Sequence, residues 1–239
     1  MKESILKVKK KKEFSGLPDS VVERALGESD NDVKSARVLL RKYFGAFLTN
    51  RVLKGSGNKL GVHLSSKKRD YEKFYSRIFE DIGKVSGVVD LGCGANGFSY
   101  EFLPDGVEYV GVEAAGQLVE QMNVFFEERA FDAISVRLDL FDMESVLDIL
   151  KKVKKPRVVF MFQIVDALES MERNFSKKLI GKIMEESEVL VVNLPLVSFG
   201  GRKRFTVDRK WLLDFLKADF VLDDDFEMFG ERVLIIKKR

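Results

Sequence analysis

The sequence has very few of the residues on which several common kinds of site depend. Among its 239 residues there is one cysteine, Cys93, and one histidine, His63. A single cysteine excludes both a disulfide framework and a metal site built from a cluster of cysteines. A single histidine excludes zinc sites that need two histidines, and it disfavours a Ser-His-Asp triad. We therefore expect no metal site.

Long apolar runs are also missing. No stretch of about 18 apolar residues occurs, so no segment is expected to span a membrane. The first residues, MKESILKVKKKKEF, are basic but lack the apolar stretch of a signal peptide. With 45% hydrophobic and 33% charged residues, the composition is that of a globular protein. These features predict a cytoplasmic protein with one large domain, or one domain with an appendage.

Charge is present in excess but is unevenly distributed. The net charge of the whole chain is only +3. Residues 1–70 contain 17 lysine and arginine residues against 8 acidic ones, a net charge of +9, which leaves −6 on residues 71–239. Such a split is typical of a basic arm that is joined to an ordinary domain and binds nucleic acid. A solvated lysine tail is the alternative interpretation.

From residue 85 onward, short apolar runs alternate with amphipathic stretches, which is typical of a mostly parallel sheet with helices on both faces. Strands are expected at Val85–Leu91, Tyr109–Glu113, Ile134–Asp139, Val158–Gln163, Val189–Leu194, Phe220–Phe226 and Val233–Lys237. Helices are expected at 97–103, 116–130, 142–151, 166–187 and 208–217. The last two strands are too close together for a crossover helix, so they should form an antiparallel hairpin at or near one edge.

This succession of five strand-helix units and a hairpin resembles the class I S-adenosylmethionine-dependent methyltransferase fold. That α/β fold is Rossmann-like, with a mostly parallel seven-stranded sheet. Before it, residues 15–54 predict two or three helices, one starting at Pro18 and one at Asp32, and a helix at 70–80 leads into the first strand. We expect a small basic, helical RNA-binding module at residues 1–84 and a methyltransferase domain at 85–239.

The most informative segment is the glycine-rich turn in Val88–Gly97. Gly92 and Gly94 allow a tight turn and a close approach of the backbone to a ligand. Together with Gly97 they also match the G-x-G-x-x-G pattern of dinucleotide sites. Asp90 distinguishes the two cofactors, because a carboxylate before this turn repels a pyrophosphate but suits the ammonium and sulfonium groups of S-adenosylmethionine. The motif therefore favours S-adenosylmethionine over NAD.

Two later strands also end in acids. Glu113 follows Gly92 by 21 residues, the spacing at which an acid accepts hydrogen bonds from ribose hydroxyls. Asp139 could accept a hydrogen bond from the adenine amino group, and Leu140 offers its backbone N–H. An exposed acid at a strand end is the alternative for Asp139. Cys93 lies inside the turn, where a small side chain is needed, and we do not expect it to act as a nucleophile.

Two basic segments flank the expected sheet. In the first, Arg69 could form a bidentate contact with the methionine carboxylate, while Lys67 and Lys68 could contact phosphate. His63, just before them, is expected to be structural. A solvated loop is the alternative for the second segment, Ser198–Phe205.

This second segment has a composition that suits RNA. It combines the cations Arg202, Lys203 and Arg204 with the aromatic Phe199 and two flexible glycines. Cations bind phosphate and aromatic rings stack on bases, so we expect the loop to grip RNA.

The order of these motifs resembles that of the aminoglycoside-resistance methyltransferases of 16S ribosomal RNA, which modify guanine N7. The motifs that carry the resemblance are His63-x-Ser65-Ser66-x-x-Arg69, Cys93-Gly94-x-Asn96, Asp139-Leu140, Leu168-Glu169, Ser198-x-Gly200-Gly201-Arg202 and Glu231-x-Val233. The resemblance implies a cofactor pocket with Arg69, Gly92, Glu113, Asp139 and Leu140. Gln163, which stands where the family usually has lysine, is assigned to the cofactor site as well. The helical module and the glycine–arginine loop are implied to face RNA.

The resemblance implies methylation of guanine N7, most simply by a housekeeping relative acting on ribosomal RNA or the small ribosomal subunit. N7 carries a free lone pair, so transfer in line with the sulfonium needs no general base. We expect the base to be flipped out and contacted by Phe199 or Arg202. A small-molecule methyltransferase and a non-catalytic RNA-binding protein are the alternatives.

Overall fold

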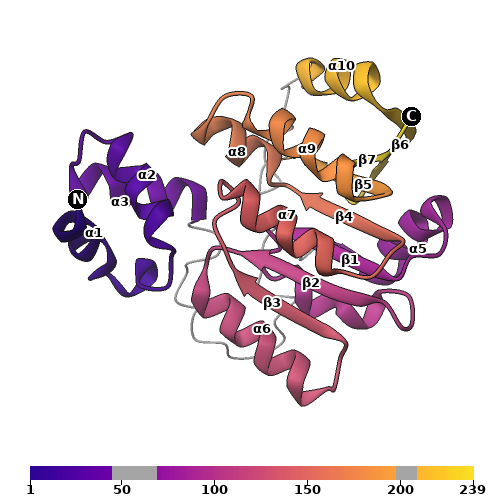
Figure 1. Ribbon diagram of the computed structural model, residues 1–239, viewed down its shortest axis with the longest axis horizontal. Coiled ribbons are helices and arrows are strands. Elements are labelled where there is room, and N and C mark those ends of the chain that lie inside the picture. Colours follow the sequence, from indigo (N-terminus) through magenta and orange to yellow (C-terminus); the bar gives the residue numbers. More distant parts are fainter. Residues whose placement is uncertain (45–68, 198–208) are drawn as a thin grey trace.

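A seven-stranded sheet forms the centre of the computed structural model, which describes residues 1–44, 69–197 and 209–239 (Figure 1). The strand order is β3-β2-β1-β4-β5-β7-β6. The bounds are β1 Gly87–Leu91, β2 Glu108–Glu113, β3 Ala133–Arg137, β4 Arg157–Phe162, β5 Val189–Pro195, β6 Val221–Met228 and β7 Glu231–Lys237. The first five strands are parallel, and β7 runs antiparallel between β5 and β6. The expected class of fold is confirmed.

The central strands are buried on both faces. Every residue of β1 and of β4 is buried. Alternate residues point to opposite sides, so Val88 packs in the core of one face with Phe160, and Val89 packs in the core of the other with Val159. This double burial explains why the parallel strands are continuous apolar runs instead of alternating patterns.

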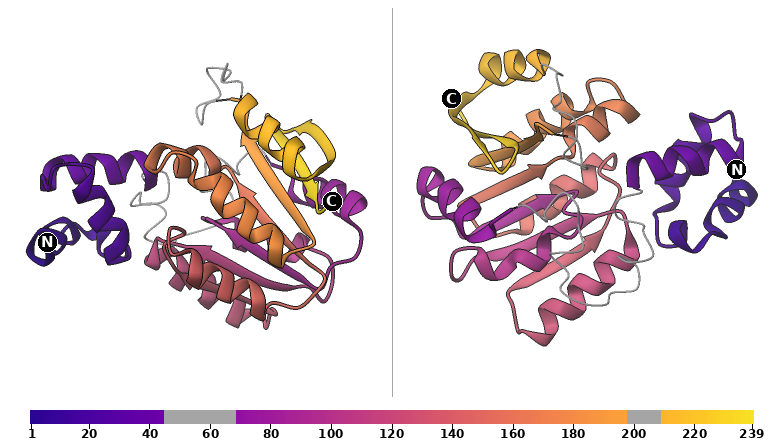
Figure 2. Two further views of the ribbon diagram at one scale, coloured as in Figure 1. Left: turned by 45° about the horizontal axis from the view of Figure 1, so that its top comes forward. Right: turned by 180° about the vertical axis from the view of Figure 1, so that it is seen from behind.

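Helices cover both faces (Figure 2). One face carries α5 (Tyr71–Ile82), the 3₁₀ helix η3 (Asn96–Phe102) and α6 (Gly116–Glu128). The other carries α7 (Met143–Lys152), α8 (Val165–Met171), α9 (Phe175–Glu186) and α10 (Lys210–Asp219). The aromatic side chains of α5 belong to the core, as expected from the sequence: Tyr75 stacks on Phe160 with 6.0 Å between ring centroids.

The helix predicted at 166–187 is wrong in one respect, because the chain forms two helices there. Asn174, between α8 and α9, adopts a left-handed conformation with φ of 64°. The carboxylate of Glu169 accepts hydrogen bonds from the backbone N–H groups of Asn174 at 2.7 Å and of Ser176 at 3.0 Å. Glu169 therefore satisfies the first turn of α9, and the continuous apolar pattern concealed this break.

The N-terminal region contains α1 (Lys2–Lys9), α2 (Asp19–Gly27) and α3 (Val33–Phe44). The second and third helices agree with the prediction. The first contradicts the interpretation of the N-terminus as an arm or a solvated tail. Ile5 and Val8, three residues apart on α1, are 5% and 0% exposed. This short apolar pair anchors the helix, although lysines dominate the sequence around it.

The three N-terminal helices form a module that docks at the carboxyl ends of the parallel strands (Figures 1 and 2). The carbonyl of Gly16 accepts a hydrogen bond from the N–H of Gly116 at the start of α6, at 3.1 Å. The side chain of Gln117 donates to the carbonyl of Lys12 at 3.2 Å. In the part of the chain that is described, no helix is long and apolar enough to cross a membrane.

Candidate cofactor-binding site

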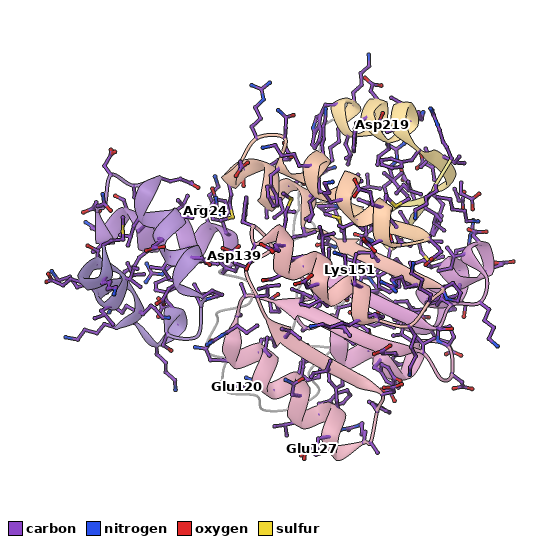
Figure 3. The ribbon with its side chains drawn as sticks, viewed as in Figure 1. Arg24, Glu120, Glu127, Asp139, Lys151 and Asp219 are labelled. Atoms are coloured by element: carbon purple, nitrogen blue, oxygen red, sulfur yellow. The ribbon has the colours of Figure 1, made fainter. Side chains whose placement is uncertain are left out.

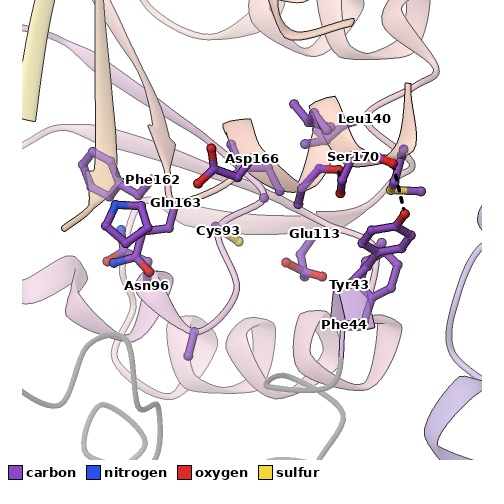
Figure 4. A pocket seen from close by; sticks show the side chains of 18 of the residues that line it. Tyr43, Phe44, Cys93, Asn96, Glu113, Leu140, Phe162, Gln163, Asp166 and Ser170 are labelled. Carbon is purple, nitrogen blue, oxygen red and sulfur yellow. Dashed lines mark hydrogen bonds between the residues drawn. The ribbon is translucent and has the colours of Figure 1, made fainter. Parts of the chain in front are cut away.

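A cavity of about 410 Å³ lies at the carboxyl ends of β1 to β4 (Figure 4). Because β1 pairs with β2 on one side and with β4 on the other, the sheet changes winding direction here, which is where such folds bind ligands. Six of the eight residues predicted to bind the cofactor line the cavity: Arg69, Gly92, Glu113, Asp139, Leu140 and Gln163. The other two, Asp90 and Gly94, are buried but do not belong to its lining.

The glycine turn has the conformation that the sequence predicted. Gly92 and Gly94 have φ values of 66° and 53°, in the left-handed region that favours glycine. A Cβ atom on Gly92 would lie 2.9 Å from the side chain of Ile164. The N–H groups of Gly92 and Cys93 both donate to the carbonyl of Val112, at 2.8 and 3.1 Å. The turn is thereby fixed to the end of β2.

Cys93 has no chemical role in this turn. Its side chain is buried, and burial, helped by the negative charges of Asp90 and Glu113, raises the pKa of the thiol well above its usual value. The thiol is therefore protonated at neutral pH, whereas a nucleophilic cysteine must be a thiolate. This agrees with the prediction that Cys93 serves packing.

One end of the cavity is formed by Glu113, Asp139, Leu140 and Phe141, and we call it the Glu113 end. The two carboxylate oxygens of Glu113 accept hydrogen bonds from the N–H of Gly94 at 2.9 Å and of Ala115 at 2.8 Å. Burial raises the pKa of Glu113, while these N–H groups act in the opposite direction. A carboxylate has about four acceptor positions, so Glu113 can still accept hydrogen bonds from a ligand.

Asp139 and Phe141 complete this end. An oxygen of Asp139 accepts a hydrogen bond from the N–H of Phe141 at 3.0 Å, and Asp139 is only 5% exposed. The ring of Phe141 stacks on Phe175 of α9, with 4.1 Å between centroids. The Glu113 end therefore offers two fixed carboxylates between apolar walls. Asp139 is not the exposed strand-end acid that was the alternative.

At the opposite end, Arg69, Asn96 and Gln163 line the cavity, and Glu231 and Asn193 lie behind them in the same hydrogen-bonded network; we call this group the Arg69 end. The Arg69 side chain is 5% exposed, and it forms a bidentate ion pair with Glu231 through Nη2 at 2.9 Å and Nε at 3.1 Å. Its Nη1 donates to Oδ1 of Asn96 at 3.2 Å. Burial opposes the charge of Arg69, but Glu231 outweighs it and raises the pKa, so the guanidinium stays charged.

Glu231 connects the polar groups of this end, although it was not among the residues predicted to bind the cofactor. Besides Arg69, it accepts hydrogen bonds from the side-chain amides of Gln163 and of Asn193, the latter at 2.9 Å. It is the first residue of β7 and lies opposite Pro195 in the ladder with β5. The motif Glu231-x-Val233 was the available signal in the sequence, but only the strand pairing brings Glu231 to Arg69.

Asp90 lies beneath the Arg69 end and is completely buried. Its Oδ2 accepts hydrogen bonds from Asn96 at 2.6 Å and from the Tyr109 hydroxyl at 3.0 Å. Burial raises the pKa of Asp90 to about 6, against the effect of these two donors. Its Oδ1 has no hydrogen-bond partner among the described residues. Asp90 is therefore a buried carboxyl with one free oxygen, separated from the cavity by Asn96.

The N-terminal module supplies a further wall that the sequence did not predict. Val21 of α2 and Lys42, Tyr43 and Phe44 of α3 line the cavity. The Tyr43 hydroxyl donates to the carbonyl of Ser170 on α8 at 3.1 Å, as the dashed line in Figure 4 marks. In the sequence these residues belong to an amphipathic helix, and nothing in its pattern indicates where the helix docks.

The residues predicted to bind RNA lie outside the described residues, and so does His63. They are Lys67, Lys68, Phe199, Arg202, Lys203 and Arg204. The described chain resumes at Arg209, which forms a bidentate ion pair with Asp166, with 2.8 Å from Nε to Oδ1. Asp166 lines the cavity, so this pair connects the cavity rim to the beginning of α10.

No group of three or more metal-ligating side chains occurs within residues 1–44, 69–197 and 209–239. The acids of the cavity have other partners. Backbone N–H groups hold Glu113 and Asp139, and Arg69 holds Glu231.

The chain is similar in sequence to a 16S rRNA (guanine(1405)-N(7))-methyltransferase of Micromonospora rosea. The two are 24% identical over 159 residues, which is 64% of this chain and 54% of that protein. The chain thus spans about half the length of this curated relative. No protein-family model matches the chain.

Solved structures of rRNA methylases have the same fold over the whole chain. The 16S rRNA methylase RmtB is 21% identical, with a TM-score of 0.79 over 100% of this chain and 98% of that one. The 16S rRNA methyltransferase RmtF, solved with S-adenosylhomocysteine, is 17% identical, with a TM-score of 0.71 over 100% and 98%. The resemblance that the motifs indicated is confirmed, and it extends to the N-terminal helices.

Proposed function

We propose that this protein is an S-adenosylmethionine-dependent methyltransferase that modifies a guanine N7 of 16S ribosomal RNA in the cytoplasm. The cavity carries the proposal, because it has fixed carboxylates at one end and a buried, charged arginine at the other. The names of the similar proteins support the same reaction. This is the function predicted from the sequence.

The Glu113 end suits the adenosine half of the cofactor. The free acceptor positions of Glu113 would take hydrogen bonds from the ribose hydroxyls. Asp139 would accept from the adenine amino group, and the backbone N–H of Leu140 would donate to the ring. The apolar side chains of Leu140 and Phe141 would enclose the base. The two carboxylates do not suit a phosphate, which is anionic and accepts hydrogen bonds.

The Arg69 end suits the amino-acid half of the cofactor. Glu231 occupies Nε and Nη2 of Arg69, so Nη1 is the guanidinium nitrogen best placed to bind a carboxylate. The charge of Asp90, which lies behind Asn96, would stabilise the ammonium group without direct contact. Gln163, held by Glu231, offers a further polar contact.

Methyl transfer to guanine N7 requires alignment of the reacting atoms and does not require proton transfer to a base. When bound, the cofactor supplies an electrophilic methyl group on its sulfonium. Guanine N7 attacks with a free lone pair, so none of the cavity acids needs to act as a base. The role of the protein is to hold the two ends of the cofactor, to place N7 in line with the methyl group, and to exclude water with apolar walls such as Phe162.

The RNA side of the proposal depends on positive charge. The module at residues 1–44 has 11 lysine and arginine residues against 7 acidic ones. Lys10, Lys11 and Lys34 are exposed on it and would face phosphate. Lys67, Lys68, Lys203 and Arg204 are proposed as further phosphate contacts, and Phe199 or Arg202 as contacts of the flipped base.

The direct test is transfer of labelled methyl groups to small ribosomal subunits and to naked 16S rRNA. We expect label in one guanine, found by chemical cleavage at 7-methylguanine, and activity that falls steeply with salt. Label in a small molecule of a cell extract, without any in RNA, would favour a small-molecule methyltransferase. Salt-dependent RNA binding without transfer would favour a non-catalytic RNA-binding protein.

Substitution of Arg202 tests the RNA side separately. We expect Arg202→Ala to lower kcat/KM for RNA by about tenfold or more and to leave the affinity for S-adenosylhomocysteine unchanged. Lys151→Ala is the matched control, because Lys151 is an exposed cation near the far end of α7 (Figure 3). Equal activity of the two variants would remove Arg202 from the proposed RNA contact.

A further inference from the structure

The N-terminal module contacts the segments that follow β2 and β4, which border the Glu113 end of the cavity. After β2, Gly116, the first residue of α6, donates its N–H to the carbonyl of Gly16 at 3.1 Å. After β4, the carbonyl of Ser170 in α8 accepts from the Tyr43 hydroxyl at 3.1 Å. The module therefore bridges α6 and α8.

The loop after β3 is held by Arg24 of α2. The guanidinium lies 3.8 Å from the centroid of the Phe141 ring, a cation–π distance. Its Nη1 is also 3.7 Å from a carboxylate oxygen of Glu172. Phe141 lies between this cation and the ring of Phe175. Figure 3 shows Arg24 and Asp139 close together where the module meets the sheet. The module therefore contacts the segments that follow β2, β3 and β4.

The last turn of α3 turns this docking surface into part of the site. Lys42, Tyr43 and Phe44 all line the cavity, and Figure 4 shows Tyr43 and Phe44 on the side of the cavity where Glu113 lies. Burial raises the pKa of Tyr43, so its hydroxyl is protonated at neutral pH and can donate to Ser170. The ring is thus held in place at the cavity wall.

We infer that Tyr43 is a positioning residue for the nucleoside half of the cofactor, and that docking of the module and binding of the cofactor strengthen each other. The inference rests on the proposed function, because it takes the Glu113 end as the nucleoside site. A nucleoside there would contact Tyr43 and would fix the segments after β2, β3 and β4 that the module contacts. Since coupling is reciprocal, RNA that holds the module in place would tighten cofactor binding by the same factor.

Calorimetric titration of the full-length protein with S-adenosylhomocysteine tests the contact. Tyr43→Ala should weaken binding by about tenfold, because the aromatic wall is lost. Tyr43→Phe keeps the ring and loses only the hydrogen bond to Ser170, so we expect a loss of about threefold. Val38→Ala is the matched control. Val38 is on the same helix but is 60% exposed, so its truncation should leave the affinity for S-adenosylhomocysteine unchanged.

Hydrogen exchange separates coupling from a merely structural effect. With the unaltered protein, S-adenosylhomocysteine should slow amide exchange in α2 and α3 as well as in the glycine turn. With Tyr43→Ala, saturating ligand should still protect the glycine turn but should protect α2 and α3 much less. A side chain that only stabilised the module would change its exchange rate with and without ligand alike.

The outcomes distinguish this inference from the function on which it rests. If the unaltered protein does not bind S-adenosylhomocysteine, the proposed function fails. If it binds, but Tyr43→Ala binds equally well and α2 and α3 show no ligand protection, the function stands and the inference is overturned.

Discussion

The two ends of the cavity differ in what holds their polar groups. At the Arg69 end, side chains hold one another: Arg69 pairs with Glu231, which also binds the amides of Gln163 and Asn193. At the Glu113 end, backbone N–H groups hold the carboxylates and aromatic rings form the walls. The first end contains no residue of the N-terminal helices α1 to α3, whereas the second shares its wall with them.

This difference has a functional consequence. A network of buried ionic groups keeps its geometry only while every partner is present, so the Arg69 end should be rigid and intolerant of substitution. The Glu113 end depends on how the module is docked, so we expect its shape to respond to RNA if the proposed function is correct. Substitutions at the two ends should therefore have different effects.

The largest effect is expected from Glu231→Gln. The substitution leaves the buried guanidinium of Arg69 without a counter-charge, which costs about 3–5 kcal/mol of unfolding free energy. Chemical denaturation measures this loss, and binding of S-adenosylhomocysteine should disappear with it. The double variant Arg69→Met with Glu231→Gln should recover much of the stability but none of the binding.

Asp225→Asn is the matched control for this prediction. Asp225 also forms a bidentate pair with an arginine, Arg232, but both side chains are about one third exposed. Exposed pairs contribute about 0–1 kcal/mol. If both substitutions cost equally little, the Arg69 end is not held by its buried ion pair.

A second prediction concerns Asp90, whose raised pKa makes stability depend on pH. Because the folded state binds the proton more tightly than the unfolded state, stability should fall as pH rises from about 4 to about 6 and then stay level. The slope is about 1.4 kcal/mol per pH unit at most. Asp90→Asn should remove this slope and should not destabilise the empty protein at pH 7.5.

Ligand binding should show the opposite pH dependence. The affinity for S-adenosylhomocysteine should rise as pH increases through about 6, because ionised Asp90 then attracts the ammonium group. Asp90→Asn should bind about tenfold more weakly at pH 7.5, with a flat profile below that pH. Unchanged binding would leave Asp90 only the structural role of fixing the glycine turn through Asn96. Titrations at pH 5, 6 and 7.5 decide between the two.

A third prediction concerns the other end of the cavity, where Glu113→Gln should cost less stability than Glu231→Gln. The amide nitrogen would face one of the two backbone N–H donors, of Gly94 or Ala115, which costs about 1–3 kcal/mol. Binding of 5′-methylthioadenosine, which contains only the nucleoside half, should weaken as much as binding of S-adenosylhomocysteine. Glu108→Gln, at the exposed start of the same strand, should affect neither ligand. A loss confined to S-adenosylhomocysteine would contradict the assignment of the two ends.

The sequence predicted the Glu113 end better than the Arg69 end. Because β2 is an almost fully buried run, Glu113 is recognisable as the acid at its end. Asp139 is recognisable as the acid that follows β3, two residues beyond its end. The glycines before them mark the turn. Each of these signals is local in the sequence, and the sheet brings them together without any further information.

What the sequence could not predict depends on contacts between distant segments. Glu231 reaches Arg69 only because β7 inserts between β5 and β6. Tyr43 reaches it only because α3 docks over α8. The helix α1 was obscured by its lysines, because just two of its residues, Ile5 and Val8, are buried. Asp90 was predicted to bind the cofactor, but in the structure it lies behind Asn96 and does not line the cavity.

The central claim is that the cavity binds S-adenosylmethionine. The most direct test is a calorimetric titration of the unaltered protein with S-adenosylhomocysteine and, separately, with NAD. We predict saturable binding of one S-adenosylhomocysteine per chain and no binding of NAD, because the acids of the cavity would repel a pyrophosphate. Binding of NAD, or of neither ligand, would contradict it.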